Sequence, residues 1–278
     1  MRAPLPLFLT ALLVTQGCAP DVAEPVGMID AAEARWSPTP LGDRDVDLAA
    51  GRDVVQRGVE FLSAQDELWF ETQAVFEVVQ DDGTKLQFDE MHRLALKRPD
   101  RMYWKTLADD ASTRTAWIGD GQFTMIREPA NVWGRVDVPP GLGAAASRVA
   151  AEYNVRIPFV DLLTGSLPEL WLGDDVESFN YIGEAWIDGQ WTDQVALTKP
   201  GVELQIWFRI GARPFPVKMV ILKAEEDGLP AYTARFRDWR TEVPDERIPT
   251  FTPPAGAERL EIVPVAPPGS AEVSDETP

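Results

Sequence analysis

Cysteine, histidine and basic residues are scarce in this chain. Its 278 residues include one Cys and one His, and 45 Asp and Glu stand against 26 Lys and Arg, for a formal net charge of −19. A single cysteine excludes a disulfide framework and a cysteine-based zinc site, and a single histidine excludes a site built from several histidines. The acidic balance argues against a nucleic-acid binder, which needs clustered cations to hold phosphates.

The N-terminal segment has the pattern of an export signal. Arg2 supplies a minimal positive end, and the apolar run from Leu5 to Val14 is too short to span a membrane. The only cysteine, Cys18, follows, as in the bacterial lipoprotein signal that this segment resembles, although Thr15 stands where leucine is usual. We therefore predict a lipoprotein signal peptide over residues 1–17 and lipidation of Cys18. An ordinary cleaved secretory signal is the alternative.

Two segments outside the domain lack the pattern of a folded core. Residues 18–42 are rich in Ala, Pro and Glu and predict a flexible tether, and residues 264–278 predict a disordered tail. The domain then runs from residue 43 to 263. We expect a lipid-anchored protein on the periplasmic side of the cell envelope. Ala19 lacks the acidic character that retains lipoproteins at the inner membrane in enteric-type sorting, which favours the outer membrane.

The first half of the domain predicts one helix followed by strands. Apolar residues such as Val55, Val59 and Leu62 recur at helical spacing, which predicts a helix over Asp47–Gln65. Alternating apolar and polar residues then predict strands joined by turns such as Asp81-Asp82-Gly83. These strands are expected over 68–80, 85–97, 101–107, 115–119, 122–127 and 132–138.

The second half predicts helices and then strands again. Pro140–Tyr153 and Pro158–Thr164 are expected to be helical, and Gly165–Asp175 a loop. About ten or eleven strands with helical inserts predict an α+β domain, in which a curved antiparallel sheet, or half-barrel, carries a helical lid. By the same alternation, Arg235 and Arg237 share a face with Trp239. The later strands are expected over 177–186, 190–199, 202–210, 217–225 and 232–240.

Several phrases of the second half match a known family. They include Tyr181-Ile182-Gly183, Lys199-Pro200-Gly201-Val202, Arg213-Pro214-x-Pro216-x-Lys218 and Tyr232-Thr233-Ala234-x-Phe236-x-Asp238-Trp239. From about Val55 to Val263 the chain resembles a predicted-periplasmic bacterial family of unknown function, whose fold is thought to be similar to that of the lipoprotein carriers LolA and LolB. The resemblance implies a LolA-like half-barrel closed by helices around an apolar cavity. It brings no catalytic residues.

Large aromatic side chains are the candidates to line such a cavity. The chain has ten Trp and twelve Phe, and most of the Trp fall in or beside predicted strands. A sheet curved around a cavity needs apolar residues on its concave face. Filling an ordinary core is the alternative role for each of them. The predicted ligand-binding residues are Trp69, Phe76, Phe88, His92, Trp104, Trp117, Trp207 and Phe236.

His92 is the single candidate for acid–base chemistry. It alternates onto the apolar face of its strand together with Glu90, and such a pair could act as an acid–base couple. A structural hydrogen bond is the alternative role. Carboxylate pairs such as Asp109-Asp110 and Asp174-Asp175 lie in predicted turns without the spaced ligands of a calcium site. We predict no metal, no cofactor and no catalytic residue.

The sequence therefore favours a binding protein. We predict a non-enzymatic, monomeric envelope lipoprotein that binds a lipid or an acylated protein in its cavity, for carriage or transfer, and meets the membrane through lipidated Cys18. The first alternative is an envelope scaffold with a packed core, whose sheet edge pairs with a protein partner. A hydrolase is the less favoured alternative.

Overall fold

The computed structural model describes residues 48–265, and its elements follow the predicted order. A helix, α1 (Leu48–Ser63), precedes six strands, three helices and five further strands. The six strands are β1 (Glu67–Val79), β2 (Lys85–Lys97), β3 (Arg101–Ala108), β4 (Thr113–Gly119), β5 (Gln122–Glu128) and β6 (Val132–Asp137). The helices are α2 (Leu142–Tyr153), α3 (Val160–Thr164) and α4 (Leu167–Leu172). The later strands are β7 (Ser178–Ile187), β8 (Gln190–Lys199), β9 (Val202–Arg209), β10 (Pro216–Lys223) and β11 (Ala231–Arg240), followed by the 3₁₀ helix η2 (Asp245–Arg247) and β12 (Glu258–Arg259).

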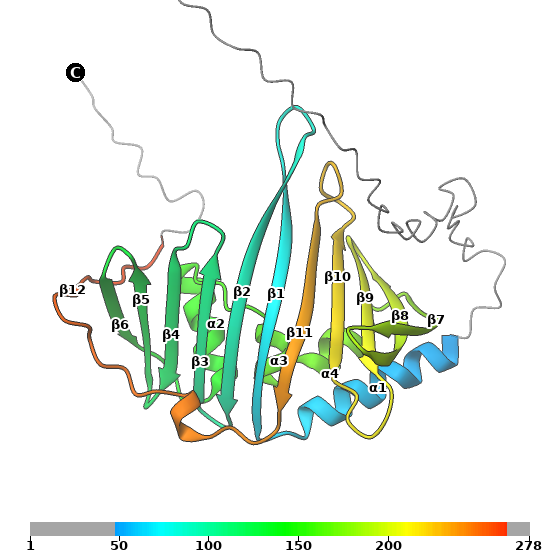
Figure 1. Ribbon diagram of the computed structural model, residues 1–278, viewed down its shortest axis with the longest axis horizontal. Coiled ribbons are helices and arrows are strands. Elements are labelled where there is room, and N and C mark those ends of the chain that lie inside the picture. Colours follow the sequence, from blue (N-terminus) through cyan, green and yellow to red (C-terminus); the bar gives the residue numbers. More distant parts are fainter. Residues whose placement is uncertain (1–47, 266–278) are drawn as a thin grey trace, which may run out of the picture. The chain divides into compact units, whose positions relative to one another are not determined.

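All the strands belong to one sheet of twelve, in the order β12-β6-β5-β4-β3-β2-β1-β11-β10-β9-β8-β7 (Figure 1). Neighbours pair antiparallel, except that β12 runs parallel to β6. The sheet does not close, because β12 and β7 are its outer strands. The predicted α+β class, with one curved antiparallel sheet and a few helices, is confirmed. The predicted signal peptide, tether and most of the tail lie outside the described residues.

Two short elements correct the predictions. The sheet has twelve strands rather than ten or eleven, because β12 adds two residues near the end of the chain. The predicted loop Gly165–Asp175 contains α4, a helix of six residues. A two-residue strand and a helix of fewer than two turns are too short to show a hydrophobic period.

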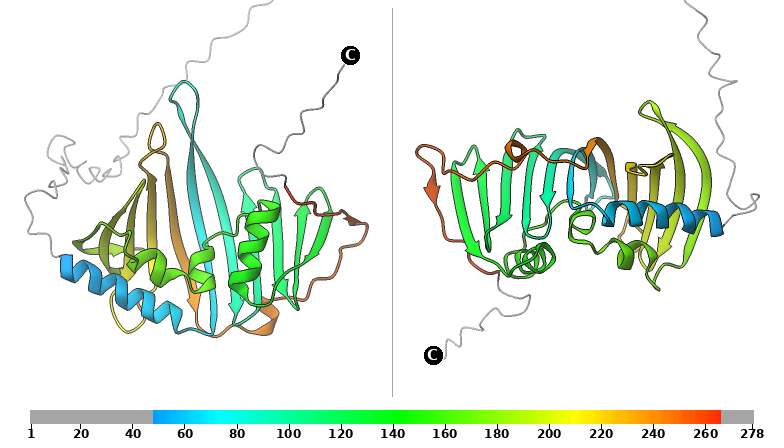
Figure 2. Two further views of the ribbon diagram at one scale, coloured as in Figure 1. Left: turned by 180° about the vertical axis from the view of Figure 1, so that it is seen from behind. Right: turned by 90° about the horizontal axis from the view of Figure 1, so that it is seen from below.

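The four α-helices cover one face of the sheet (Figure 2). We call this side the helix-covered face and the other side the opposite face. The main core lies between helices and sheet, and includes Val55 of α1, Phe70 of β1 and Phe208 of β9. Helix α1 approaches β7 closely, since a Cβ atom at Gly51 would lie 2.7 Å from the carbonyl oxygen of Phe179.

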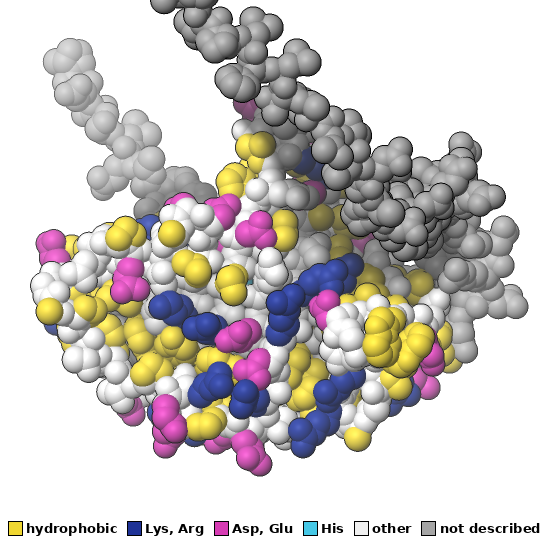
Figure 3. All heavy atoms as spheres, viewed as in Figure 1, with side chains coloured by type: hydrophobic (Ala, Val, Ile, Leu, Met, Phe, Trp, Pro, Cys, Tyr) yellow, Lys and Arg dark blue, Asp and Glu magenta, His cyan; other side chains and the backbone are white. Residues whose placement is uncertain are grey.

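The opposite face carries charged side chains and a smaller core. Figure 3 shows Lys and Arg side chains spread over its central strands, with apolar side chains among them. The smaller core consists of Trp69, Ala95, Tyr103, Val243 and Ile248. Val243 and Ile248 belong to residues 241–265, which we call the C-terminal strap.

The C-terminal strap crosses the opposite face and passes around the β6 edge. Trp117 donates its Nε1–H to the carbonyl oxygen of Pro249 at 2.8 Å, and Phe251 packs between Trp117 and Trp133 at ring distances of 5.0 and 5.1 Å. Farther along, Ile262 packs against the main core. The strap therefore covers the β6 edge of the sheet.

Candidate functional site

The structure divides the eight predicted ligand-binding residues between the two faces. Five point to the helix-covered face: Phe76, Phe88, His92, Trp104 and Phe236. Three point to the opposite face: Trp69, Trp117 and Trp207.

Strand alternation explains the separation. Trp69 lies between Leu68 and Phe70, whose side chains face the helices, so the pleat turns its indole to the opposite face. Trp207 is likewise flanked by core residues of β9, and the Lys218 ammonium lies 4.4 Å above its ring. Trp69, Trp117 and Trp207 are thus corrected from the predicted set, because they cannot line a space beneath the helices.

A bulge in β11 also overturns the expectation that Trp239 shares a face with Arg235. Asp238 adopts a left-handed conformation (φ 50°), and the register of β1 with β11 shifts at this point. One extra residue reverses the alternation. Trp239 therefore packs in the main core, 4.3 Å from Phe70 between ring centroids, while Arg235 pairs with Asp188 at 3.1 Å.

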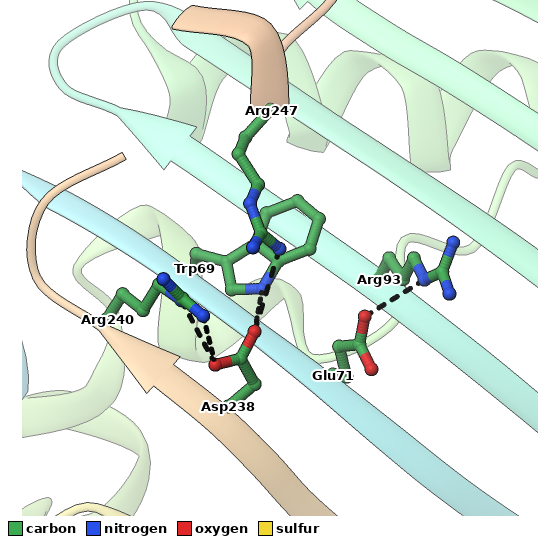
Figure 4. Close-up of polar contacts among 6 residues, drawn as sticks. All are labelled: Trp69, Glu71, Arg93, Asp238, Arg240 and Arg247. Carbon is green, nitrogen blue, oxygen red and sulfur yellow. Dashed lines mark hydrogen bonds and ion pairs between the residues drawn. The ribbon is translucent and has the colours of Figure 1, made fainter. Parts of the chain in front are cut away.

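The bulge carboxylate is the centre of a polar cluster on the opposite face (Figure 4). Asp238 accepts hydrogen bonds from Trp69 Nε1 at 3.2 Å and from Arg240 Nη2 at 2.8 Å. Arg247 of η2 lies 3.6 Å from the same carboxylate and 4.3 Å above the Trp69 ring. These contacts attach the C-terminal strap to the sheet.

On the helix-covered face, the feature that sequence reasoning missed is Phe159, in the loop before α3. Its ring lies 5.1 Å from Phe236, 5.8 Å from His92 and 6.0 Å from both Phe70 and Tyr232. Its backbone is left-handed (φ 53°), which is uncommon for a bulky residue. The sequence places this residue inside a predicted helix over Pro158–Thr164, whereas α3 begins only at Val160, and only the tertiary structure brings Phe159 to the predicted residues.

A row of polar side chains lies beside Phe159 on three neighbouring strands. Thr72, His92 and Thr106 occupy directly opposed positions of β1, β2 and β3. His92 Nδ1 lies 3.0 Å from Thr106 Oγ1. His92 Nε2 and Thr72 Oγ1 are buried and have no hydrogen-bond partner within the described residues.

The charge nearest this row belongs to Glu90. Its Oε2 lies 3.5 Å from His92 Nε2, and its Oε1 accepts a hydrogen bond of 2.7 Å from Arg114. Burial, with a smaller contribution from Arg114, lowers the pKa of His92 to about 4. Burial raises the pKa of Glu90 despite Arg114, and burial with the Glu90 charge raises the pKa of Tyr232.

These values bear on the acid–base role considered for His92. At neutral pH its ring is uncharged, and its side chain is only 1% exposed. A solvent-borne substrate therefore has no access to either ring nitrogen in this conformation. His92 is therefore buried, whereas the Glu90 side chain beside it is 18% exposed.

Short helices cover this part of the helix-covered face. We call residues 141–173 the lid. Helix α2 is flanked by Gly141, which provides no side-chain cap, and by Asn154. Helix α3 is flanked by Phe159 and Gly165, and all four flanking residues have positive φ. Polar contacts between lid and sheet include a hydrogen bond of 2.8 Å from Lys199 Nζ to the Leu170 carbonyl oxygen.

The space beneath the lid is filled in this conformation. Phe70 and Phe236 are at most 2% exposed, and Ala74 and Ala234, which pair across β1 and β11, are fully buried. Hollows in the described part of the chain open elsewhere on its surface. One of about 550 Å³ lies beside α4, and one of about 210 Å³ lies between α1 and strands β8 and β9; neither is lined by Phe159.

Residues 48–265 contain neither a metal-binding cluster of side chains nor a helix that could span a membrane. Within this range, no three His, Cys, Asp or Glu side chains are grouped so that they could hold a metal ion. None of the helices in the same range combines the length and apolarity needed to cross a membrane.

Comparisons with known proteins give one family match and several likenesses in fold. The profile of a family described as "Predicted periplasmic protein (DUF2092)" matches residues 51–263. No curated protein sequence matches the chain.

The likenesses are to solved structures of low sequence identity. LprF from Mycobacterium bovis is 12% identical over 73% of this chain and 97% of its own, with a TM-score of 0.45. The lipoprotein LppX from Mycobacterium tuberculosis is 12% identical over 70% and 98%, with a TM-score of 0.41. A LolA superfamily protein from Nitrosomonas europaea is 9% identical over 72% and 97%, with a TM-score of 0.34.

Proposed function

Because the chain belongs to the DUF2092 family of predicted periplasmic proteins, we propose that it is a non-enzymatic envelope protein that binds the hydrophobic part of a lipid or an acylated protein. The ligand lies on the helix-covered face, in space that Phe159 and the lid occupy in the closed conformation. The observation that carries this proposal is the position of Phe159. Its aromatic ring, held by a strained loop, fills the centre of an aromatic surface.

The floor under Phe159 supports this proposal. Phe159 contacts both Tyr232 and Phe236, so its ring lies over Ala234, which is between them on the same face of β11. Ala74 lies beside Ala234 on β1. Two small residues flanked by aromatic rings leave a depression once Phe159 is displaced, and an acyl chain fits such an apolar depression.

The construction of the lid supports its opening. Helices α3 and α4 have five and six residues, and neither has a side-chain cap hydrogen bond. Helices this short are not stable by themselves and depend on packing against the sheet. A ligand that replaces this packing can therefore displace the lid without disturbing the twelve-stranded sheet.

Anchoring completes the proposal. Lipidation of Cys18, which lies outside the described residues, would hold the protein at the outer membrane, at the end of a tether. A tethered protein suits the receiving end of a transfer relay better than a shuttle that must diffuse. We expect it to act as a monomer.

The test uses the full-length chain with Cys18→Ser, which removes the acylation site, purified from cells without added lipid. Native mass spectrometry with lipid extraction is expected to find acyl ligands in stoichiometric amount. N-phenyl-1-naphthylamine fluorescence then measures uptake by the delipidated protein. Phe159→Ala is expected to increase uptake, because it removes the ring that fills the depression.

Phe251→Ala is the matched control, because Phe251 is also half-buried among aromatic rings but lies on the opposite face. It is expected to leave uptake unchanged. A lipid-free mass together with no uptake by either the parent chain or Phe159→Ala would contradict the proposal.

The second candidate is an interaction module at the other sheet edge. Strand β7 has no strand beyond it in the described part of the chain. Trp186 and Trp191, at the tip of β7 and β8, are 58% and 54% exposed and 5.3 Å apart between ring centroids. Under this alternative, Trp186→Ser with Trp191→Ser abolishes a defined complex in envelope crosslinking, while Phe159→Ala leaves it intact.

A further inference from the structure

The two unpartnered polar atoms beneath the lid belong to neighbouring residues of β1 and β2. Thr72 and His92 are directly opposed on β1 and β2. Side chains at such positions have Cβ atoms about 4.5–5.5 Å apart, so one ligand atom can reach both. The residues are only 3% and 2% exposed. A buried polar group without a partner destabilises the folded state, and two side by side indicate that something else satisfies them.

Both atoms are suited to donate a hydrogen bond. The carboxylate of Glu90, 3.5 Å from His92 Nε2, favours the tautomer that carries its proton on Nε2. Nδ1 then accepts a hydrogen bond from the Thr106 hydroxyl at 3.0 Å. The Thr72 hydroxyl is a free donor in the same place. Two donors on directly opposed residues can together serve the two lone pairs of a carbonyl oxygen.

The surroundings select a neutral carbonyl group. A free fatty acid would bring a second carboxylate close to the half-buried Glu90, where like charges repel. Arg114 already donates to Glu90. An ester has the carbonyl oxygen without the charge, and its chain can continue over Ala74 and Ala234 into the depression that Phe159 fills.

We propose that Thr72 and His92 form a subsite for the ester carbonyl of an acyl chain, so that the protein selects esterified chains over free fatty acids. This inference rests on the proposed function, because the chain must first enter beneath the lid. The same ester occurs in glycerolipids and in the diacylglyceryl group of lipoproteins, and its chemistry is common to both.

The test compares four ligands of equal chain length on the full-length chain with Cys18→Ser: decane, methyl decanoate, 1-decanoylglycerol and decanoate. Competition with N-phenyl-1-naphthylamine at pH 7.5 gives the affinities. The two esters are expected to bind at least about fivefold more tightly than decanoate, the scale of the repulsion between two carboxylates a few ångströms apart. A synthetic diacylglyceryl-cysteine peptide is then compared with 1-decanoylglycerol in the same assay. Tighter binding of the peptide identifies lipoproteins as the source of the ester, and tighter binding of 1-decanoylglycerol identifies glycerolipids.

Thr72→Val removes the hydroxyl and keeps the shape. It is expected to weaken methyl decanoate about two- to tenfold and to leave decane unchanged. Thr115→Val is the matched control, because Thr115 is also buried, at 6% exposed, but lies on the opposite face of the sheet. Thr72→Ser, which keeps the donor, is expected to bind the ester almost as the parent does and covers the case in which Thr72→Val does not fold.

The only histidine of the chain supplies a direct readout. With ¹⁵N-histidine labelling, the Nε2 resonance is expected to shift on addition of methyl decanoate but not of decane. Equal affinities for esters and decanoate, with no effect of Thr72→Val and no Nε2 shift, would overturn the subsite while leaving the proposed function intact. Failure of all the ligands, decane included, would overturn both.

Discussion

The state of the single histidine measures how dry the space beneath the lid is. Burial lowers the pKa of His92 to about 4, from an ordinary value of 6.5. We therefore compare how the free energy of unfolding changes on acidification in the parent chain and in His92→Gln. Glutamine keeps polar atoms at the position but does not titrate.

The sign and size of the expected change in stability follow from proton linkage. Above pH 6.5, His92 is neutral in both the folded and the unfolded chain, so its titration costs no stability. Below pH 6.5 the unfolded chain binds a proton that the folded chain does not, and the folded state loses stability until about pH 4. Since one pKa unit corresponds to about 1.4 kcal/mol, the loss approaches ~3 kcal/mol.

Glu90 acts in the opposite direction. Its raised pKa means that the folded chain binds this proton at a higher pH than the unfolded chain does, which stabilises the fold as the pH falls. The parent chain alone therefore shows a smaller loss than His92 causes. The difference in unfolding free energy between the parent and His92→Gln removes the Glu90 contribution to a first approximation.

Urea unfolding at several pH values between 4 and 7.5 gives that difference, and NMR of the labelled histidine gives the pKa itself. We expect the parent to lose about 3 kcal/mol relative to His92→Gln over this range. A histidine that titrates near 6.5, with parallel stability curves for the two proteins, would refute the argument that the lid excludes water.

Two further predictions concern packing elsewhere, both read from urea unfolding. Asp238→Ala leaves the buried indole N–H of Trp69 unpaired and is expected to destabilise the fold by about 1–3 kcal/mol, whereas Asp238→Asn, which keeps an acceptor and tolerates the left-handed backbone, loses less. Gly58→Ala places a methyl group against the Phe208 ring and is expected to cost about 1–3 kcal/mol, whereas Gly143→Ala, whose nearest neighbouring atom is 3.9 Å away, is expected to cost nothing. Equal effects within either pair would contradict the packing described.

The sheet could be predicted because alternation and turns are local signals. The bounds of β2 and β8 agree with the sequence to the residue. Alternation also predicts the correct face of Trp69, because its neighbours Leu68 and Phe70 face the helices. The predicted ligand-binding set is chosen by aromatic character alone and does not use this information. The bulge at Asp238 is different, because nothing in the local pattern announces the extra residue that turns Trp239 inward.

The candidate site could be predicted only in part. The sequence placed His92 and Glu90 together on one face, which their separation of 3.5 Å reflects. Phe159 and the Thr72 hydroxyl were not predicted as part of the site, because their roles depend on contacts between a loop and a strand that are far apart in the chain. Contacts of that range have no period and no spacing in the sequence.

The closed lid sets a condition on the length of the ligand chain. Exposing a fully buried Phe side chain costs about 1.5–3 kcal/mol, and each CH₂ group buried in its place contributes about 0.8 kcal/mol. Phe159 is half-buried, so at most about four methylene groups offset it, and the remaining length must offset the displaced packing of α3 and α4. Affinity should therefore rise about fourfold per added CH₂ across a series of methyl esters, and very short esters should fail to open the lid. An affinity independent of chain length would place the ligand outside the depression over Ala234, however tightly it binds.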